Sequence, residues 1–249
     1  PARGETYVPD APGARVSPRP SQVAKVSGMT DPARDNSDDA PVFDADFLAR
    51  LEDLIRWRRD VRRFRDTPVD GALIDKLIGL ATLAPSVGNS QPWRFVKVAD
   101  AGRRARVIEN FEACNADALD DFAGEQAKKY ASLKLSGMIE APVHLAVFCD
   151  AATQAGHGVG RKTMPEMLQY SVVGALGTLW LAARAHGLGM GWVSIIEPAV
   201  VSDILEVPDD WSLIAYLCIG YPQEEHIDPE LERHGWQERL DISGLVLDR

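Results

Sequence analysis

The sequence predicts an α+β domain in which a central mixed sheet is flanked by helices. Strand-like apolar runs alternate along the chain with segments whose apolar residues recur every three or four positions. No GxGxxG motif follows the first strand, and no GxxxxGK[ST] motif occurs anywhere. The sequence therefore favours neither a Rossmann dinucleotide site nor a P-loop.

Composition argues against two classes of partner. The 249 residues carry a formal net charge of −10, so no basic surface for nucleic acid is expected. The three cysteines, Cys114, Cys149 and Cys218, form no CxxC pair, and the five histidines show no HxxxH spacing. We expect no bound metal, no disulfide framework and a reducing, cytoplasmic location.

A membrane location is not expected. No apolar stretch approaches the roughly 20 residues that a bilayer-spanning helix needs. The richest run, residues 172–185, is interrupted by glycines and followed by His186. The start of the chain also lacks the basic-then-apolar order of a secretory signal.

The first 43 residues predict an irregular tail, and residues 44–249 the folded domain. The tail contains no Leu, Ile or Trp and many prolines, so it cannot bury enough apolar surface to offset its ordering entropy. From residue 45 the apolar spacing predicts a helix, and a second follows Pro68 and ends before Pro85. Their apolar stripes comprise Phe47, Leu48, Leu51, Leu54 and Ile55 in the first helix and Leu73, Ile74, Leu77, Ile78 and Ala81 in the second.

The remaining elements alternate in type. Strands are predicted over residues 95–98, 143–149, 192–196 and 213–219, the last one central. Two charged helices are expected within residues 101–137, and a short helix over 198–205. The helix predicted over 164–185 is apolar nearly all round, so we expect it in the core or at a subunit interface. From residue 221 the chain reads as irregular.

The strongest local signal for chemistry is the run Arg58-Arg59-Asp60-Val61-Arg62. It places three guanidiniums within five residues where a helix ends. The planar donor fork of arginine suits a phosphate. The alternative is that these cations complement the negative end of the helix dipole and stay solvated.

Two further segments have the composition of a ligand site. Residues 85–93, PSVGNSQPW, can present hydrogen-bonding groups to a flat heterocycle. Residues 187–194, GLGMGWVS, contain glycines that permit close approach of a ligand to the backbone. The alternatives are an ordinary helix-to-strand connection and an ordinary glycine-rich turn.

Together these segments resemble the nitroreductase-like superfamily. RRDVR is similar to its phosphate-binding element, APSVGNSQPW to its flavin-ring loop, and LWLAARAHGLGMGWVS to its core helix and the following strand. The resemblance covers residues 45–249 in the right order. It implies a mostly antiparallel sheet and an FMN site at the interface of a homodimer.

Asp60 and Ser194 narrow the resemblance to the BluB family of dimethylbenzimidazole synthases. Typical nitroreductases carry Ser or His where this chain has Asp60, and the stretch GEQAKKYASLKL also resembles the BluB family. The family's lid over the flavin corresponds to residues 122–137. The asparagine and serine at 89 and 90 and the long N-terminal tail depart from the family pattern.

The resemblance assigns site residues position by position. Asp60 and Ser194 match the catalytic pair, and no metal ligand is implied. The cofactor contacts fall on the arginine run, the flavin-ring loop, the strand beside the ring and a late phosphate-binding cation. They are Arg58, Arg59, Asp60, Val61, Arg62, Pro85, Ser86, Asn89, Gln91, Gly191, Trp192 and Arg239.

The implied reaction consumes reduced FMN and O2 and yields 5,6-dimethylbenzimidazole and erythrose 4-phosphate. NAD(P)H enters only through a separate flavin reductase. Neighbouring arginines favour an ionised Asp60, which suits a general base. Ser194 has no histidine close in sequence, so we expect it to position flavin or oxygen by hydrogen bonding. The alternatives are an ion pair that orders the arginines and a local strand hydroxyl.

Two other functions stay open from the sequence. An NAD(P)H-dependent nitroreductase or flavin reductase would retain FMN and cycle it. A flavin store or sensor would bind FMN without making a product.

Overall fold

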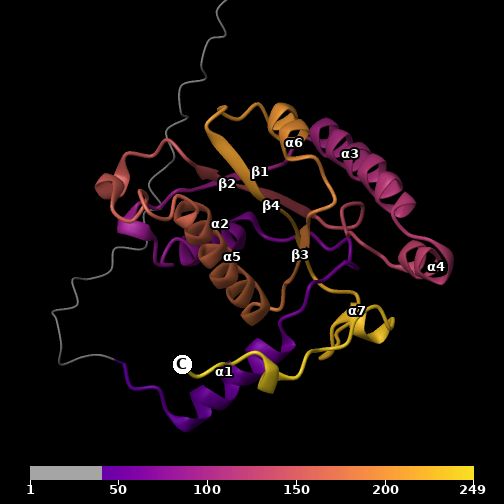
Figure 1. Cartoon of the computed structure of the whole chain (residues 1–249), viewed down its shortest axis with the longest axis horizontal. Coiled ribbons are helices and arrows are strands. Elements are labelled where there is room, and N and C mark those ends of the chain that lie inside the picture. Colours follow the sequence, from indigo (N-terminus) through magenta and orange to yellow (C-terminus); the bar gives the residue numbers. More distant parts are fainter. Residues whose placement is uncertain (1–40) are drawn as a thin grey trace, which may run out of the picture. The chain divides into compact units, whose positions relative to one another are not determined.

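The structure is a computed structural model that describes residues 41–249. The prediction of an irregular tail over residues 1–43 therefore lies outside the described residues, apart from its last three positions. Residues Asp44–Arg249 form one compact unit. Its elements alternate between helix and strand as the sequence predicts (Figure 1).

A four-stranded sheet occupies the centre of this unit, in the order β1-β2-β4-β3. All neighbouring strands run antiparallel, which confirms the expectation of a mostly antiparallel sheet. Among residues 41–249 the only parallel pairing is an isolated bridge between Asp60 and Met190. The strands are β1 (Trp93–Lys97), β2 (Val143–Asp150), β3 (Gly189–Val193) and β4 (Trp211–Gly220).

Three of the helices begin where the sequence supplies an N-capping aspartate. Asp44, Asp70 and Asp100 each accept a backbone N–H in the first turn of the helix that follows. Pro198 opens α6 at a position where proline is favoured. The helices are α1 (Ala45–Trp57), α2 (Gly71–Ala81), α3 (Ala101–Asp120), α4 (Gly124–Ser132), α5 (Met167–Ala185), α6 (Pro198–Leu205) and α7 (Glu230–Arg233).

Helices cover both faces of the sheet (Figure 1). Along β2, Leu145 and Val147 belong to the core that packs against α2 and α5. Their neighbours Ala146 and Phe148 belong to a second core, which includes residues of α3 and α6. Because both faces are buried, β2 and β4 read as continuous apolar runs with no polar alternation.

The third strand differs from its predicted position. β3 spans Gly189–Val193, whereas the sequence predicts residues 192–196 and a turn before them. The glycines there serve chain packing: a Cβ on Gly189 would lie 2.7 Å from Cγ2 of Val61, and one on Gly191 would collide with the Val61 carbonyl oxygen. The glycines therefore let residues 60–61 lie against the strand.

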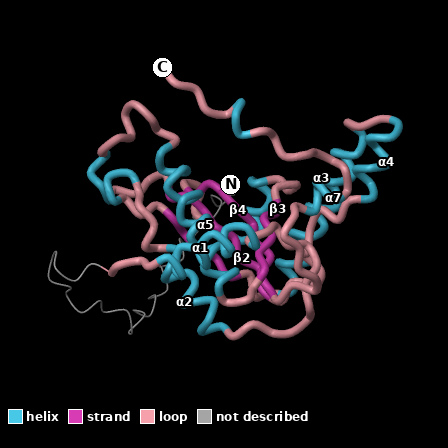
Figure 2. The backbone as a smooth tube through the Cα atoms, turned by 90° about the horizontal axis from the view of Figure 1, so that it is seen from below, coloured by secondary structure: helices cyan, strands magenta, loops and turns pink. Residues whose placement is uncertain are grey.

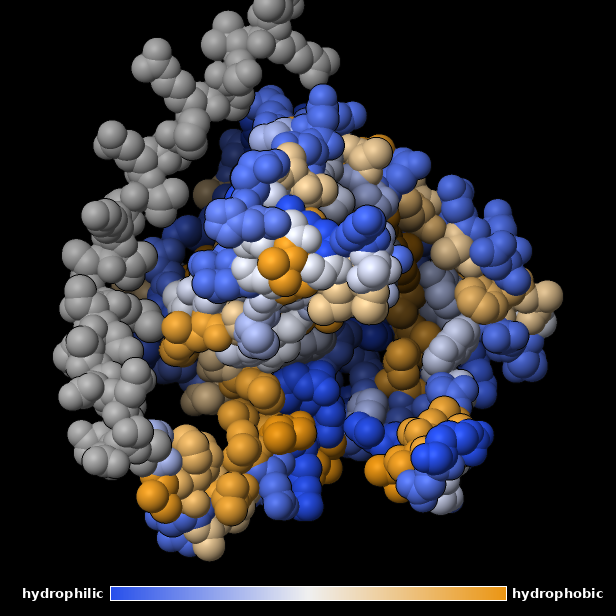
Figure 3. Space-filling view, turned by 60° about the vertical axis from the view of Figure 1, so that its left-hand side comes forward, coloured by the Kyte–Doolittle hydropathy of each residue, from blue (hydrophilic) through white to orange (hydrophobic). Residues whose placement is uncertain are grey.

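Two helices leave apolar side chains exposed. No residue of α1 is buried, and Leu48 and Ile55 are about half exposed. One face of α5 packs into the core, while Tyr170 and Val173 lie on its exposed face. Figure 3 shows hydrophobic side chains gathered at the end of the molecule where α1 lies. Such a surface is typical of an interface between subunits.

Candidate functional site

The arginine run lies in an extended segment between α1 and the sheet. Arg58 ends α1 with extended backbone angles, and the Val61 N–H donates to the Met190 carbonyl oxygen at 3.0 Å. Side chains of an extended segment alternate in direction. Accordingly, Asp60 interacts with β3, and Arg62 interacts with residues 122–137. Arg59 and Arg63 point the other way and interact with residues 222–233.

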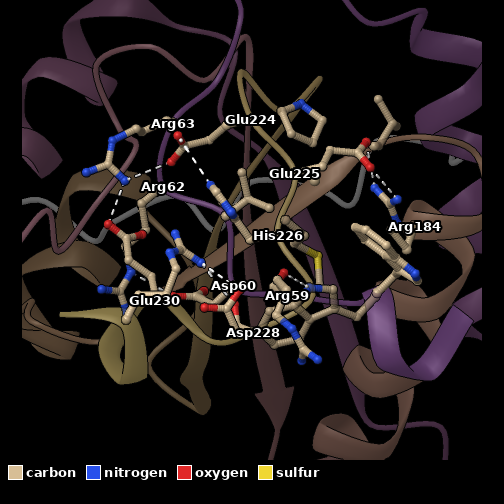
Figure 4. A pocket seen from close by; sticks show the side chains of 18 residues that line it. Arg59, Asp60, Arg62, Arg63, Arg184, Glu224, Glu225, His226, Asp228 and Glu230 are labelled. Atoms are coloured by element: carbon tan, nitrogen blue, oxygen red, sulfur yellow. Dashed lines mark hydrogen bonds and ion pairs between the residues drawn. The ribbon is translucent and has the colours of Figure 1, made fainter. Parts of the chain in front are cut away.

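Both carboxylate oxygens of Asp60 accept hydrogen bonds. Oδ1 accepts the backbone N–H of Trp192 at 2.9 Å, and Oδ2 accepts Nε of Arg62 at 2.8 Å. The side chain is 31% exposed and lines a pocket (Figure 4). The carboxylate is thus fixed in orientation and still open to a ligand.

Arg62 connects Asp60 to residues 122–137, the segment expected to form the lid. Its Nη1 donates to the Lys134 carbonyl oxygen at 3.1 Å, and its side chain is only 14% exposed. At the end of the lid, Gly137 packs against the Phe64 ring so closely that a Cβ would lie 2.6 Å from Cδ2. The carboxylate and the lid backbone therefore share one guanidinium.

Arg58 and Arg59 carry charges that no described carboxylate pairs with at salt-bridge distance. Arg59 donates to the carbonyl oxygens of Ile227 at 2.7 Å, of Arg58 at 2.8 Å and of Arg56. Burial, and then the positive charges of Arg58 and Arg239, lower the pKa of Arg59. An anion bound among these cations would relieve their repulsion.

Ion pairs close the opposite side of the pocket (Figure 4). Arg63 binds Glu230 at 2.5 Å and Glu224 at 3.3 Å, and the hydrogen bond to Glu230 raises the pKa of Arg63. Arg184 makes two hydrogen bonds to Glu225, at 2.9 and 2.7 Å. These arginines are neutralised by carboxylates and fix the segment after β4.

Trp180, on α5, lines the pocket, although no sequence motif indicated it. Its Nε1–H donates to the Arg59 carbonyl oxygen at 3.2 Å, and the Arg58 guanidinium lies 4.9 Å from its ring centroid. The Trp192 ring lies 6.3 Å away. The sequence feature that could have indicated Trp180 is the presence of a tryptophan within a helix of smaller apolar residues.

The other expected contacts do not line this pocket. In the loop, the Gln91 N–H donates to Ser86 Oγ at 3.0 Å, and Gln91 Nε2 to Asn89 Oδ1 at 3.3 Å. The loop packs against residues 155–158. The side chains outside the pocket lining are Arg58, Pro85, Ser86, Asn89, Gln91, Gly191, Trp192, Ser194 and Arg239.

Five of these residues are exposed, namely Pro85, Asn89, Gln91, Ser194 and Arg239. Ser194 follows the last residue of β3. Arg239 lies 3.9 Å from Glu232. Their chemistry is therefore available to a ligand or to another chain.

Two further properties of the described residues concern metal-binding groups and membrane-spanning helices. Within residues 41–249, no group of three or more His, Cys, Asp or Glu side chains is arranged to hold a metal ion. In the same residues, no helix combines the length and the apolar character needed to cross a membrane.

Comparison with known proteins identifies close relatives. The family model described as "Nitroreductase family" matches residues 55–221. The 5,6-dimethylbenzimidazole synthase of Rhodospirillum rubrum is 57% identical over 199 residues, which cover 80% of this chain and 94% of the relative. A 5,6-dimethylbenzimidazole synthase of Rhodobacter capsulatus is 50% identical, covering 76% and 92%.

Solved structures share the fold at lower identity. Oxidised iodotyrosine deiodinase bound to FMN and 3-iodo-L-tyrosine matches with a TM-score of 0.61 and 26% identity. The match covers 71% of this chain and 91% of the deiodinase. The expected nitroreductase-like fold is thereby confirmed.

Proposed function

Since this chain belongs to the nitroreductase family, with synthases as its close relatives, we propose that it is a 5,6-dimethylbenzimidazole synthase. It would fragment reduced FMN with O2 and release erythrose 4-phosphate. A separate flavin reductase would supply the reduced FMN, so NAD(P)H would act only indirectly. The observation that carries the proposal is the 57% identity to a synthase over nearly that relative's full length.

The unpaired arginines fit the phosphate of FMN. Arg58 and Arg59 form no salt bridge with a described carboxylate, and burial, followed by the charges of Arg58 and Arg239, lowers the pKa of Arg59. A phosphate dianion accepts several charge-assisted hydrogen bonds from such a cluster. We assign Arg58, Arg59 and Arg239 to the phosphate, and Arg62 to the ribityl side of the site.

Asp60 is the proposed general base. When bound, reduced FMN supplies the reactivity toward O2 and the carbon atoms of the product. The Asp60 carboxylate accepts hydrogen bonds from Arg62 and from the backbone of β3, and these two bonds fix its orientation. Held this way, Oδ1 or Oδ2 can take a proton from the ribityl carbon that becomes part of the product ring. Ser194, exposed after β3, would position flavin or oxygen.

The flavin-ring contacts require a second copy of the chain. Pro85, Ser86, Asn89 and Gln91 do not line the pocket that contains Asp60. The exposed apolar faces of α1 and α5 supply a surface that a homodimer would bury. In Figure 2 the C-terminal segment that follows α7 extends away from the other helices and the strands. Its exposed side chains include Leu245 and Leu247, which add apolar surface.

The direct test supplies FMN, NADPH and a separate flavin reductase in air. Chromatography should detect 5,6-dimethylbenzimidazole in amounts that match the FMN lost. Omitting the flavin reductase should leave only a trace of product. Retention of FMN with steady NADPH oxidation would instead identify a nitroreductase, and binding without product a flavin store.

Asp60→Asn keeps the shape of the side chain and removes its charge. We expect product formation to fall about 100-fold or more, because general-base catalysis contributes on that order. FMN binding, measured by fluorescence quenching, should change little. Asp66→Asn, an exposed carboxylate on the same segment, is the matched control and should retain normal activity. A normal rate in Asp60→Asn would disprove the assignment.

Ser194→Ala tests the second member of the pair. Loss of one positioning hydrogen bond should slow product formation about tenfold without abolishing it. Complete loss of product with a normally folded protein would mean that Ser194 takes part in covalent chemistry. Ser202→Ala, on α6, is the control hydroxyl.

A further inference from the structure

The lid is fastened to the C-terminal segment by three aromatic rings. Phe122 stacks on Tyr130 with 4.8 Å between ring centroids, and Trp236 meets Phe122 edge-on at 5.5 Å. Trp236 also lies 6.2 Å from Tyr130. Tyr130 is the only buried residue of α4, so its ring contacts hold that helix in place.

Backbone geometry directs Trp236 to this position. Gly235 ends α7 with φ of +64°, and the Trp236 N–H returns to the Leu231 carbonyl oxygen at 2.8 Å. This is the Schellman pattern, in which a glycine reverses the chain after a helix. Lys129 of the lid donates from Nζ to the Gly235 carbonyl oxygen at 3.1 Å.

The same C-terminal segment reaches the proposed phosphate site. Glu230, at the start of α7, binds Arg63 at 2.5 Å, and Arg59 donates to the Ile227 carbonyl oxygen at 2.7 Å. Arg239 follows Trp236 by three residues and lies 3.9 Å from Glu232 of α7. One short segment therefore carries both the contact to the lid and the late phosphate-binding cation.

We propose that Trp236 is a positioning residue that couples Arg239 to the lid, so that binding of the FMN phosphate closes residues 122–137 over the flavin. This inference rests on the proposed function. A bound phosphate would draw Arg239 toward Arg58 and Arg59, and the short stretch from Trp236 to Arg239 would carry Trp236 and the α4 helix packed on it along. Closure of a helical lid excludes water from the reacting flavin.

Hydrogen–deuterium exchange of residues 124–132 tests the coupling directly, with oxidised FMN or riboflavin as the probe. FMN should slow exchange in the wild-type protein. Riboflavin has the same ring and no phosphate, so at saturation it should leave exchange close to that of the free protein. Equal protection by both ligands would overturn the proposal.

Trp236→Ala should abolish the FMN-dependent protection and weaken FMN binding about tenfold, because two aromatic contacts are lost. Trp236→Phe keeps a ring and should restore both. Leu240→Ala, an exposed apolar residue on the same segment, should behave as wild type. If Trp236→Ala does not fold, protection retained in Trp236→Phe but lost in Arg239→Ala supports coupling, whereas protection retained in both overturns it.

A double-mutant cycle separates coupling from independent effects. After Arg239→Ala, the further change Trp236→Ala should not weaken FMN binding, because the ring would act through Arg239. Additive losses would overturn the proposal. Product formation by the wild-type protein is measured separately, so an absent product counts against the proposed function alone and a missing exchange response against this coupling alone.

Discussion

At the scale of single residues, Arg62 has a different environment from the other arginines of its run. Its Nε binds the Asp60 carboxylate and its Nη1 binds the Lys134 carbonyl oxygen, so its guanidinium spans two acceptors. Arg58 and Arg59 have no such carboxylate partner among the described residues. The arginine run therefore divides into two cations without a carboxylate partner and one cation that orders Asp60.

Arg62→Lys should slow product formation between about tenfold and 100-fold. Lysine retains the charge, yet its compact ammonium cannot span two acceptors as a planar guanidinium does, and one charge-assisted hydrogen bond is lost. The rate is measured with reduced FMN at saturation. Arg103→Lys is the control, since Arg103 also binds one carboxylate and one carbonyl oxygen, far along the chain on α3. Equal effects of the two substitutions would contradict the role of Arg62.

At the scale of elements, the paired strands β2 and β4 bury an ionisable cluster apart from the site. Nδ1 of His144 lies 2.9 Å from the Tyr216 hydroxyl, and both side chains are fully buried. Burial, and then the charge of Arg104, lower the pKa of His144 from 6.5 to about 4. The histidine is thus neutral in the folded protein near pH 7.

This cluster predicts a loss of stability in weak acid. In the unfolded chain His144 binds a proton as pH falls through about 6.5, whereas in the folded protein it resists protonation down to about pH 4. The free energy of unfolding therefore falls by roughly 3 kcal/mol as the pH is lowered from 6.5 to 4.

Urea unfolding from pH 7 to 4.5 measures this loss. His144→Gln removes the ionisable group, so its curve should fall less steeply with acid than that of the wild type. His157→Gln, at an exposed loop position, should follow the wild type. Parallel curves for wild type and His144→Gln would contradict the assignment.

At the scale of the whole molecule, Leu48 and Ile55 of α1 and Val173 of α5 expose apolar surface on the described unit. Leu48 and Ile55 lie on one stripe of α1, and Val173 lies on the outer face of α5. The loop that carries Asn89 and Gln91 does not line the pocket of Asp60. The proposed homodimer would explain both observations, since it would bury the stripes and bring a second loop to each flavin.

Introducing charge on the α1 stripe should separate the subunits. The double substitution Leu48→Asp and Ile55→Asp should give a monomer in analytical ultracentrifugation, because two carboxylates would be buried unpaired in the interface. The monomer should keep its fold by circular dichroism, since neither residue belongs to the core. It should bind FMN much more weakly. Asp53→Ala, an exposed residue on the opposite side of α1 from Leu48 and Ile55, should remain dimeric.

The sequence by itself determined most of the elements and the family, although β3 begins earlier than predicted and α7 forms where an irregular chain was expected. Apolar spacing located α1 and α2, proline placed the start of α6, and continuous apolar runs marked β2 and β4 as buried strands. These signals are local, because they depend on helical or strand periodicity over a few residues. The order of RRDVR, the loop of residues 85–93 and the glycine-rich strand then indicated the fold.

Only the tertiary structure decided how the site is assembled. Gly189 and Gly191 read as a turn, yet they belong to β3 because Val61 packs against them from about 130 residues away in the chain. No local pattern distinguishes Trp180 and Trp236, which the fold brings into contact with Arg59 and Phe122. Such contacts join distant segments, so no local pattern records them.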